Sequence, residues 1–563
     1  MSTASKASER RPGRSAPLAA VWRYHRLSKH ALGHYAEGPG YLDWANQPEP
    51  FRRFAGAHEV PLPLAADDDT PLFDALVRPG AIRPRPLTRQ TLGLFLELSL
   101  GITAWKSFQG TKWALRGNPS SGNLHPTEGY LLIPALPGIS DRPGVYHYAP
   151  REHALEERSR LGADAWSALS GDPPALAFLA GLSSVHWREA WKYGQRAYRY
   201  CQHDVGHALG ALSFAAAALG WRVWLLSHVS DADISGLLGL ERQGDFAQAE
   251  PEAPELLAAV LTNPTGSESV PLPHDAVERV RQGAWRGQAN RLSQSHVDWS
   301  EIPVVARAAT KPRTGDSTPL TAAPPLAAAP TPARSDGLSA ARLIRRRRSA
   351  VALDGQTGLA RSNFVAMMAA ALPDPARPPW QSVGFPARVQ LALFVHRVEN
   401  LPAGLYMLMR DGDRRSALRA ACHRKFAWLD VELASLPLYA LALGDFRPAA
   451  AQASCLQEIA ADGAFSLAMV ADFARTLEEE GSWAYRRLFW ECGLIGQALY
   501  LQAEAAGVRA TGIGCYFDDL VHRLLGLGSE EWQSLYHFTV GGALEDDRLT
   551  TLPAYAHLGR GCS

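Results

Sequence analysis

Two short segments concentrate side chains that could bind a charged ligand. The first runs from Arg116 to Tyr130 and contains the turn Pro119-Ser120-Ser121-Gly122-Asn123 ahead of an apolar stretch. Its hydroxyls, side-chain amide and backbone N–H groups lie within a few residues of one another. The same residues would also suit a tight turn that is capped by its own serines and binds nothing.

The second segment is Arg345-Arg346-Arg347-Arg348-Ser349. A guanidinium group is planar and binds a phosphate or carboxylate through two parallel hydrogen bonds. Neighbouring helical residues point about 100° apart, so four consecutive arginines cannot all reach one anion. The alternative is a solvated basic cap that flanks a linker.

Composition limits the class of protein that could carry these segments. The 563 residues are 46% hydrophobic and 20% charged, which is typical of a globular chain of two to four domains. Lys and Arg (57) nearly balance Asp and Glu (56), so we expect no nucleic-acid partner. The six cysteines form no C-x-x-C pair, which favours reduced core residues in a cytoplasmic protein.

No segment predicts secretion or a membrane span. Residues 1–14 are polar and basic without an apolar stretch behind them, as in a frayed tail. Gly206 to Leu226 is the most apolar stretch, but Gly220-Trp221-Arg222 interrupts it. A buried helix therefore fits this stretch better than a membrane helix.

The common catalytic motifs are absent from the sequence. It contains no G-x-G-x-x-G after a strand, no P-loop, no H-E-x-x-H and no G-x-S-x-G. The histidines of the first half match no common zinc spacing, so we expect no metal site; they are His186, His203, His207 and His228.

A segment rich in Pro, Ala, Thr and Ser from about Ala306 to Ala340 divides the chain. It holds too few large apolar residues to offset the entropy of ordering, so we expect an extended linker. The predicted organisation is a disordered tail (1–20), a first domain (21–300), the linker (301–340) and a second domain (341–556).

The two halves share a repeat. Residues 198–240 align without a gap on residues 485–527, with 14 identities in 43 positions, where average residue usage gives roughly three. Gly144-Val145-Tyr146 and Gly404-Leu405-Tyr406 are a second, weaker match, each after an apolar strand-like stretch. The order strand, turn, strand, long helix and short helix predicts an α+β domain, present twice.

The long repeated helix carries many small residues between Ala208 and Ala218. Small side chains let another helix approach closely. We expect the helix at about 198–219 to pack on its equivalent at about 485–506 around a pseudo-two-fold axis. An Ala-rich helix that contacts only its own domain is the alternative.

These motifs together resemble the nitroreductase-like family of FMN flavoproteins. Arg347-Arg348-Ser349 and Pro119-Ser120-Ser121-Gly122-Asn123 match two motifs of the family. Tyr24-His25, Ser28-Lys29-His30 and the stretch from Trp191 to Tyr200 are similar to the branch that contains the thiazole/oxazole (azoline) dehydrogenases. The resemblance implies two tandem nitroreductase-like domains that form an intramolecular pseudo-dimer, expected to be monomeric.

The resemblance also implies a set of FMN-binding residues. Arg347 and Ser349, then Arg348, are the candidates for the phosphate, although Val351 stands where the family often has a second basic residue. The turn from Pro119 to Asn123, with Arg116 beside it, would face the flavin. Gly512-Ile513-Gly514 would bring backbone N–H groups to the reactive edge of the ring, because glycine permits close approach.

Each half lacks motifs that the other half keeps. The second half has the arginine motif and the glycines, but its stretch Trp380–Ala387 has lost the serine turn. In the first half, Leu225-Leu226-Ser227 replaces the glycines and residues 75–89 show no arginine-serine motif. We therefore expect one composite FMN site per chain.

The implied activity is that of an FMN oxidoreductase acting on a small molecule or a peptide. A reductase would draw hydride from NAD(P)H, whereas an azoline-type dehydrogenase would oxidise a peptide heterocycle. Lys192 and Tyr193 are the candidate acid–base residues, with an exposed lysine and a packing tyrosine as the alternative. A degenerate flavin-binding or scaffold protein without turnover is the competing hypothesis.

Overall fold

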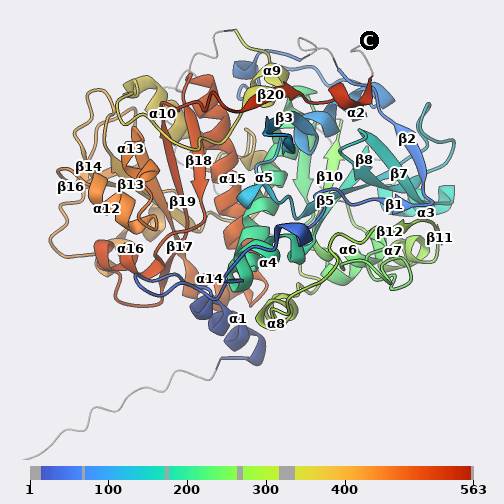
Figure 1. The fold of residues 1–563 in the computed structure, drawn as a ribbon, viewed down its shortest axis with the longest axis horizontal. Helices are drawn as coiled ribbons and strands as arrows, with labels where there is room; N and C mark the ends of the chain where they lie inside the picture. Colours follow the sequence, from blue (N-terminus) through green and yellow to red (C-terminus); the bar gives the residue numbers. More distant parts are fainter. Residues whose placement is uncertain (1–13, 66–69, 172–175, 263–269, 316–336, 560–563) are drawn as a thin grey trace, which may run out of the picture.

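The computed structural model describes residues 14–65, 70–171, 176–262, 270–315 and 337–559. These residues form two large antiparallel sheets, one from each half, with two long helices between them (Figure 1). The mixed α+β class predicted from the order of the elements is confirmed. None of the described helices is both long and apolar enough to cross a membrane.

The two sheets have matching strand orders, β7-β6-β5-β8-β10-β9 and β16-β14-β13-β17-β19-β18. Their register also matches, since Ile133 pairs with Gly144 in the first sheet and Val395 pairs with Gly404 in the second. The matched strands are β5 (Thr127–Ile133), β6 (Gly144–Ala149), β7 (Ala154–Arg160), β8 (Phe178–Ser184), β9 (Arg222–Leu225) and β10 (Ala253–Leu261), and β13 (Val389–Val395), β14 (Gly404–Leu408), β16 (Leu438–Leu443), β17 (Phe465–Asp472), β18 (Arg509–Ile513) and β19 (Trp532–Gly541).

The remaining strands lie at edges. In the large sheets, β2 (His58–Pro61), β11 (Ala284–Trp285) and β15 (Leu429–Asp430) extend the edge opposite to β9 and β18. Two small sheets contain β1 (Phe54–Ala55) with β12 (Gln288–Ala289), and β3 (Ile102–Phe108) with β4 (Thr111–Arg116) and β20 (Thr550–Pro553).

Helices cover the sheets and connect their strands. In the first half they are α1 (Ala16–Leu27), α2 (Arg89–Ser99), α3 (Ala163–Ser170), α4 (His186–Tyr193), α5 (Ala197–Ala218), α6 (Asp231–Leu238), α7 (His274–Arg281) and α8 (Glu301–Ala308). In the second half they are α9 (Ala340–Arg346), α10 (Arg361–Ala371), α11 (Arg415–Ala421), α12 (Arg447–Ala453), α13 (Ile459–Asp462), α14 (Phe473–Glu480), α15 (Ala484–Ala505) and α16 (Asp518–Leu525).

Helices α5 and α15 pack against each other in the centre of the molecule, and every residue of both is buried (Figure 1). Their closest approach is at Gly206 and Gly493, which occupy equivalent positions of the repeat. A Cβ atom at either glycine would overlap the backbone of the other helix. Tyr198 and Tyr485, a second equivalent pair, stack with ring centroids 6.4 Å apart. The predicted contact between the repeated helices is therefore present, at the glycines rather than at the later alanines.

Two reciprocal ion pairs connect the halves at equivalent positions. Arg199 of α5 contacts Asp518 of the second half at 2.7 Å, and Arg486 of α15 contacts Asp231 of the first half at 2.8 Å. All four side chains are buried. The repeat identities Arg199/Arg486 and Asp231/Asp518 thus serve the contact between halves.

Each half also packs a terminal segment against the other half. Helix α1 lies against the second half, where Trp22 contacts Phe473 and His25 contacts Tyr485. Strand β20, near the C-terminus, pairs with β3 of the first half (Figure 1). These two arms cross the predicted domain boundaries in opposite directions.

Two predicted boundaries differ from the structure. Residues 16–20, assigned to a disordered tail, form the start of α1. Residues 301–308, assigned to the linker, form α8, because Ile302 and Val305 lie three residues apart and become buried on one face. Lys311 is buried as well, and residues 316–336 of the predicted linker lie outside the described residues.

Candidate active site

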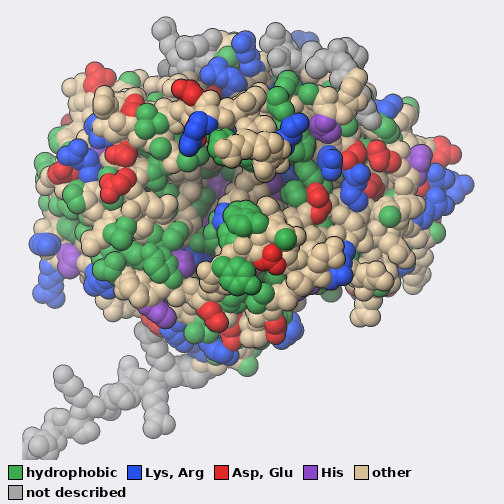
Figure 2. All heavy atoms as spheres, viewed as in Figure 1, with side chains coloured by type: hydrophobic (Ala, Val, Ile, Leu, Met, Phe, Trp, Pro, Cys, Tyr) green, Lys and Arg blue, Asp and Glu red, His purple; other side chains and the backbone are tan. Residues whose placement is uncertain are grey.

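A cavity of about 500 Å³ lies between the two halves. Its walls include the turn Pro119–Asn123 and Tyr193 from the first half, and Arg347–Ser349 and Gly512–Gly514 from the second. The volume is in the range of cofactor pockets. The face in Figure 2 is hollowed between the halves, with histidine side chains visible inside. The structure thus brings the two sequence motifs together in one cavity.

Arg347 is buried at this cavity, with a side chain that lacks a counter-ion. Its Nη2 donates a hydrogen bond to the carbonyl oxygen of Arg116 at 2.9 Å. Its Nε and Nη1 have no partner among the described residues. Burial, together with the nearby charge of Arg509, lowers the pKa of Arg347 to about 10. The free N–H groups and the uncompensated charge suit an anionic ligand.

Arg345 and Arg346 point away from the cavity, whereas Arg348 also lines it. Helix α9 ends at Arg346, so helical spacing does not extend to Arg347 and Arg348. Arg345 pairs with Glu97 and Arg346 with Glu504. Arg348 donates to the backbone carbonyl oxygens of Arg345 and Arg347, and burial together with Arg347 lowers its pKa to about 10.

Ser349 differs from the expectation for a phosphate ligand. Its hydroxyl shares a hydrogen bond of 2.9 Å with the hydroxyl of Tyr500, which also accepts one from the backbone N–H of Gly512. Ser349 therefore links the arginine segment to the glycine segment.

The serine turn is held by several internal contacts. The hydroxyl of Ser120 accepts a hydrogen bond from the backbone N–H of His125, and the amide of Asn123 donates to the carbonyl oxygen of Ala114. The backbone N–H and hydroxyl of Ser121 both donate to Asp204. Gly122 has a φ of 59°, a conformation that favours glycine. The turn therefore caps itself in part, as the alternative interpretation stated, while still lining the cavity.

Glycine is required at positions 512 and 514. A Cβ atom at Gly512 would overlap the hydroxyl of Tyr536, and one at Gly514 would overlap the ring of Tyr200. The side chain of Ile513 packs away from the cavity, in the core on the far side of the second sheet. Only backbone atoms of Ile513 can therefore serve a ligand.

Lys192 and Tyr193 both reach the serine turn. The Nζ atom of Lys192 lies 3.1 Å from the position of a Cβ atom on Gly122, and the hydroxyl of Tyr193 lies closer still. Burial raises the pKa of Tyr193 well above its ordinary value, so its phenol stays protonated. Tyr193 thus presents a hydroxyl donor at the cavity, while Arg116 directs its Nη2 to the carbonyl oxygen of Pro50 instead.

Several cavity residues were missed by the sequence analysis. Asp204 is buried, and burial raises the pKa of its carboxyl group to about 7. Its repeat equivalent Glu491 accepts hydrogen bonds from the backbone N–H groups of Arg388 and Val389, so both carboxylates cap the turn before a strand. The repeat aligns Asp204 with Glu491, and this acidic residue at the same position in both halves could have indicated the role. Further lining residues that were missed include Tyr200, His207, Tyr500, Arg509 and Tyr536.

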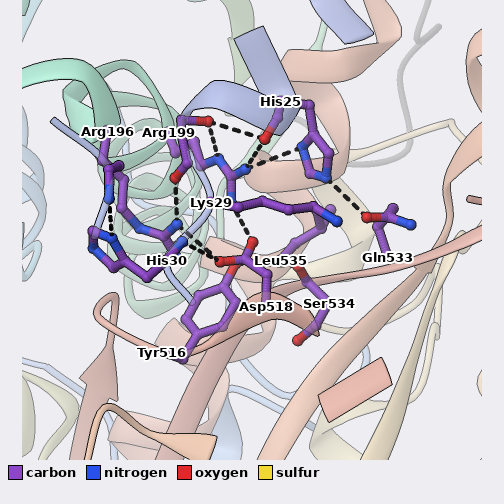
Figure 3. A network of polar contacts seen from close by, with 12 residues as sticks. His25, Lys29, His30, Arg196, Arg199, Tyr516, Asp518, Gln533, Ser534 and Leu535 are labelled. Carbon is purple, nitrogen blue, oxygen red and sulfur yellow. Dashed lines mark hydrogen bonds and ion pairs between the residues drawn. The ribbon is translucent and has the colours of Figure 1, made fainter. Parts of the chain in front are cut away.

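A buried network holds the glycine segment from outside the cavity (Figure 3). Arg196 donates to the carbonyl oxygen of Gly514 at 3.1 Å and pairs with Asp518 at 3.0 Å. Arg199 and the backbone N–H of His30 contact the same carboxylate. These contacts place the pKa of Asp518 well below its ordinary value. The first half thereby positions a segment of the second half.

The equivalent position on the other side of the central helices is occupied differently. There a cavity of about 260 Å³ is lined by Leu225–Ser227. Arg487 and Trp490 stand where the first site has Tyr200 and His203, and Arg487 pairs with Glu480. This second cavity is thus smaller than the first, and its arginine Arg487 has a carboxylate partner, whereas Arg347 of the first cavity has none among the described residues.

Comparison with known proteins agrees with this architecture. Residues 344–542 match the model of the nitroreductase family. This domain is therefore similar to the nitroreductase family. A curated protein of Methanocaldococcus jannaschii named "Putative nitroreductase MJ1384" is 25% identical over 181 residues, which are 31% of this chain and 87% of that protein. The family predicted from the sequence motifs is confirmed.

The fold of both halves together also occurs in a solved structure. The crystal structure of a "putative nitroreductase" from Anabaena variabilis superposes with a TM-score of 0.66 at 21% identity. The match covers 93% of this chain and 99% of that chain. The nitroreductase-like fold therefore extends over the first half, which the family model does not cover.

Proposed function

We propose that the protein is an FMN-dependent oxidoreductase whose two nitroreductase-like domains form an intramolecular pseudo-dimer with one composite flavin site. The observation that carries the proposal is the buried Arg347 guanidinium, with two N–H groups that lack partners among the described residues. The nearby charges of Arg348 and Arg509 add to its need for an anion. A dianionic phosphate such as that of FMN satisfies both requirements.

The other predicted residues have defined places in this proposal. The turn from Pro119 to Asn123 forms the opposite wall from the first domain. Gly512 and Gly514 pack closely against Tyr536 and Tyr200 of the same cavity, so a side chain at either position would displace a wall residue. Ser349 acts through Tyr500, as a positioning residue for the glycine segment rather than as a phosphate ligand.

When bound, FMN would supply hydride transfer, which protein side chains cannot perform alone. The protein would position the cofactor and hold protons at the rim of the cavity. Tyr193 stays protonated there and can donate a hydrogen bond, and the amine of Lys192 lies beside the same turn. Asp204 fixes the turn through Ser121.

The direction of the reaction follows from the electron source or acceptor. A reductase would take hydride from NAD(P)H, whereas an azoline-type dehydrogenase would take it from a peptide heterocycle. Steady-state oxidation of NADPH with a quinone acceptor supports the reductase. Bound FMN without such turnover supports the dehydrogenase. A protein that stays colourless with added FMN would instead support a scaffold without turnover. Whichever direction hydride is transferred, we propose that the enzyme is cytoplasmic and monomeric.

The proposal is tested by exchanging neighbouring arginines. Arg347→Gln removes the unpaired guanidinium, and we expect FMN to bind about 10- to 100-fold more weakly, because a charge-assisted hydrogen bond contributes about 1.5–3 kcal/mol. Fluorescence titration with FMN measures the affinity. The matched control is Arg346→Gln, since Arg346 is half exposed and paired with Glu504. Equal affinities for the two variants would contradict the assigned phosphate site.

A further inference from the structure

Two cysteines lie on adjacent segments at the rim of the candidate active site. Cys455 follows α12, and Cys515 follows the glycine segment and lines the cavity. The segments are joined by a backbone hydrogen bond of 2.8 Å from Phe517 to Ala453 and by the Gln457 amide, which donates to the carbonyl oxygen of Cys515 at 2.9 Å. Both cysteines are half-buried and free. Each thiol is the leading cause of the pKa shift of the other, which is consistent with thiols that lie side by side on the two joined segments.

His30 of the N-terminal arm faces the same sulfur. Its backbone bridges Phe517, and its Nδ1 accepts a hydrogen bond from the backbone N–H of Ala36 at 2.9 Å. The proton of the neutral ring is therefore on Nε2, which is left to donate to Cys515. Figure 3 shows His30 beside Arg196 and Asp518. Cys515 thus meets two donors, the thiol of Cys455 and the imidazole N–H of His30.

This environment separates the two thiols chemically. The hydrogen bonds from Cys455 and His30 lower the pKa of Cys515 to about 5, while the pKa of Cys455 is raised. A thiolate next to a protonated thiol is the arrangement of an attacking and a resolving cysteine. The charged and titratable groups that face the pair are His30, Tyr35, Tyr193, Arg196, Tyr200 and Asp518.

The other described cysteines contrast with this pair. Burial raises the pKa of Cys422 to about 12 and that of Cys201 and Cys492 well above the ordinary value. The described residues contain no group of three or more His, Cys, Asp or Glu side chains that could hold a metal ion. The pair with His30 is therefore not accounted for by metal binding or by simple core packing.

We propose that Cys515 and Cys455 form a redox-active thiol pair that is oxidised to a disulfide by hydrogen peroxide. The thiolate of Cys515 attacks one peroxide oxygen, the O–O bond breaks, and hydroxide leaves, which gives a sulfenic acid. The sulfur of Cys455 then attacks the sulfenic sulfur, the S–S bond forms, and water leaves with the proton of Cys455. In sum, two thiols and one peroxide give one disulfide and two waters.

The disulfide would connect the end of α12 to the residue after Gly514. Because Gly514 borders the cavity, oxidation would restrain one wall of the site. The chemistry requires no bound flavin, so the proposal can fail or succeed independently of the proposed function.

The first experiment measures the reactivity of the thiols in the native full-length chain. Iodoacetamide labelling followed by peptide mass mapping gives the rate at each cysteine between pH 4 and pH 9. We expect the Cys515 rate to reach half its maximum near pH 5, whereas an ordinary thiol does so near about 8.5. His30→Phe should move the midpoint upward, and Cys422 is the internal control. A midpoint for Cys515 at the ordinary value would overturn the proposal.

The second experiment follows the oxidation itself. Peroxide treatment of the wild-type chain should give a peptide in which Cys455 and Cys515 are linked, with the loss of two hydrogens. Cys455→Ser should instead accumulate a sulfenic acid on Cys515 that dimedone traps, and Cys515→Ser should give neither product. Mapping distinguishes links to Cys562, which lies outside the described residues. Overoxidation of Cys515 in the wild type without the link, or a link to another cysteine, would overturn the pairing.

Discussion

At the scale of single residues, the cavity is defined by charges that the protein leaves uncompensated. Arg347 is 3% exposed, yet it forms no ion pair with any described carboxylate. Elsewhere in the described chain, buried arginines such as Arg199 and Arg486 each have an aspartate partner. Burying an unpaired charge lowers the free energy of unfolding of the ligand-free protein. A bound anion would offset this cost, as is typical of functional sites.

Asp204 gives a pH-dependent prediction at this scale. Burial raises the pKa of its carboxyl group to about 7, above the ordinary value of 3.8. The folded state then binds the proton more tightly than the unfolded state, so this group lowers the free energy of unfolding as the pH rises towards 7. Between pH 5 and pH 8 the loss amounts to about 3 kcal/mol.

The prediction is tested with Asp204→Asn, which keeps an acceptor for Ser121 but does not titrate. The difference in the free energy of unfolding, variant minus wild type, should be about 3 kcal/mol larger at pH 8 than at pH 5. Urea denaturation at the two pH values measures it. Glu545→Gln, at an exposed carboxylate on the same cavity, is the control and should change nothing. A stability difference independent of pH would mean that Asp204 is ionised throughout this range.

At the scale of elements, the repeat identities explain how α5 and α15 pack. Gly206 and Gly493 allow backbone contact, and the two arginine–aspartate pairs close the contact on either side. The two pairs are equivalent in sequence but differ in surroundings. Asp518 also binds Arg196, which holds the carbonyl oxygen of Gly514, whereas Asp231 lies outside the candidate active site.

This difference predicts separate effects of two equivalent substitutions. Arg486→Gln should lower stability by about 3–5 kcal/mol, because it removes the arginine partner of the buried Asp231. Arg199→Gln should cost less, because Asp518 keeps its ion pair with Arg196. Only Arg199→Gln should also weaken FMN binding, since only its aspartate supports the glycine segment. Melting temperature and FMN titration measure the two effects. Equal losses of FMN affinity in both variants would contradict the assignment of the site to one side.

Much of this element-level arrangement could be predicted from the sequence. The gapless repeat predicted both long helices within one residue of their observed ends. The expected helical spacing of the arginines holds only as far as Arg346, where α9 ends. Contacts between segments without a repeat equivalent could not be predicted. The pairing of β20 with β3 depends on residues more than 400 positions apart, and the burial of α8 depends on α1.

At the scale of the whole molecule, the arms and the central helices make the two halves interdependent. Helix α1 packs on the second half through Trp22 and Phe473. His30, which follows α1, binds Asp518, and Asp518 pairs with Arg196, which holds the carbonyl oxygen of Gly514. Strand β20 closes the hairpin of β3 and β4, whose last residue is Arg116. A site built at this junction requires both halves, while the smaller cavity at the equivalent position is lined by Trp490 and Arg487.

The number of flavins on each chain tests the asymmetry of the two positions most directly. Purified protein saturated with FMN and freed of excess cofactor gives this number from its absorbance in the flavin band against that of the 16 Trp and 16 Tyr residues. We expect one FMN per chain, bound about 10- to 100-fold more weakly in Arg347→Gln. Two FMN molecules per chain, or an unchanged affinity in that variant, would contradict the single composite site.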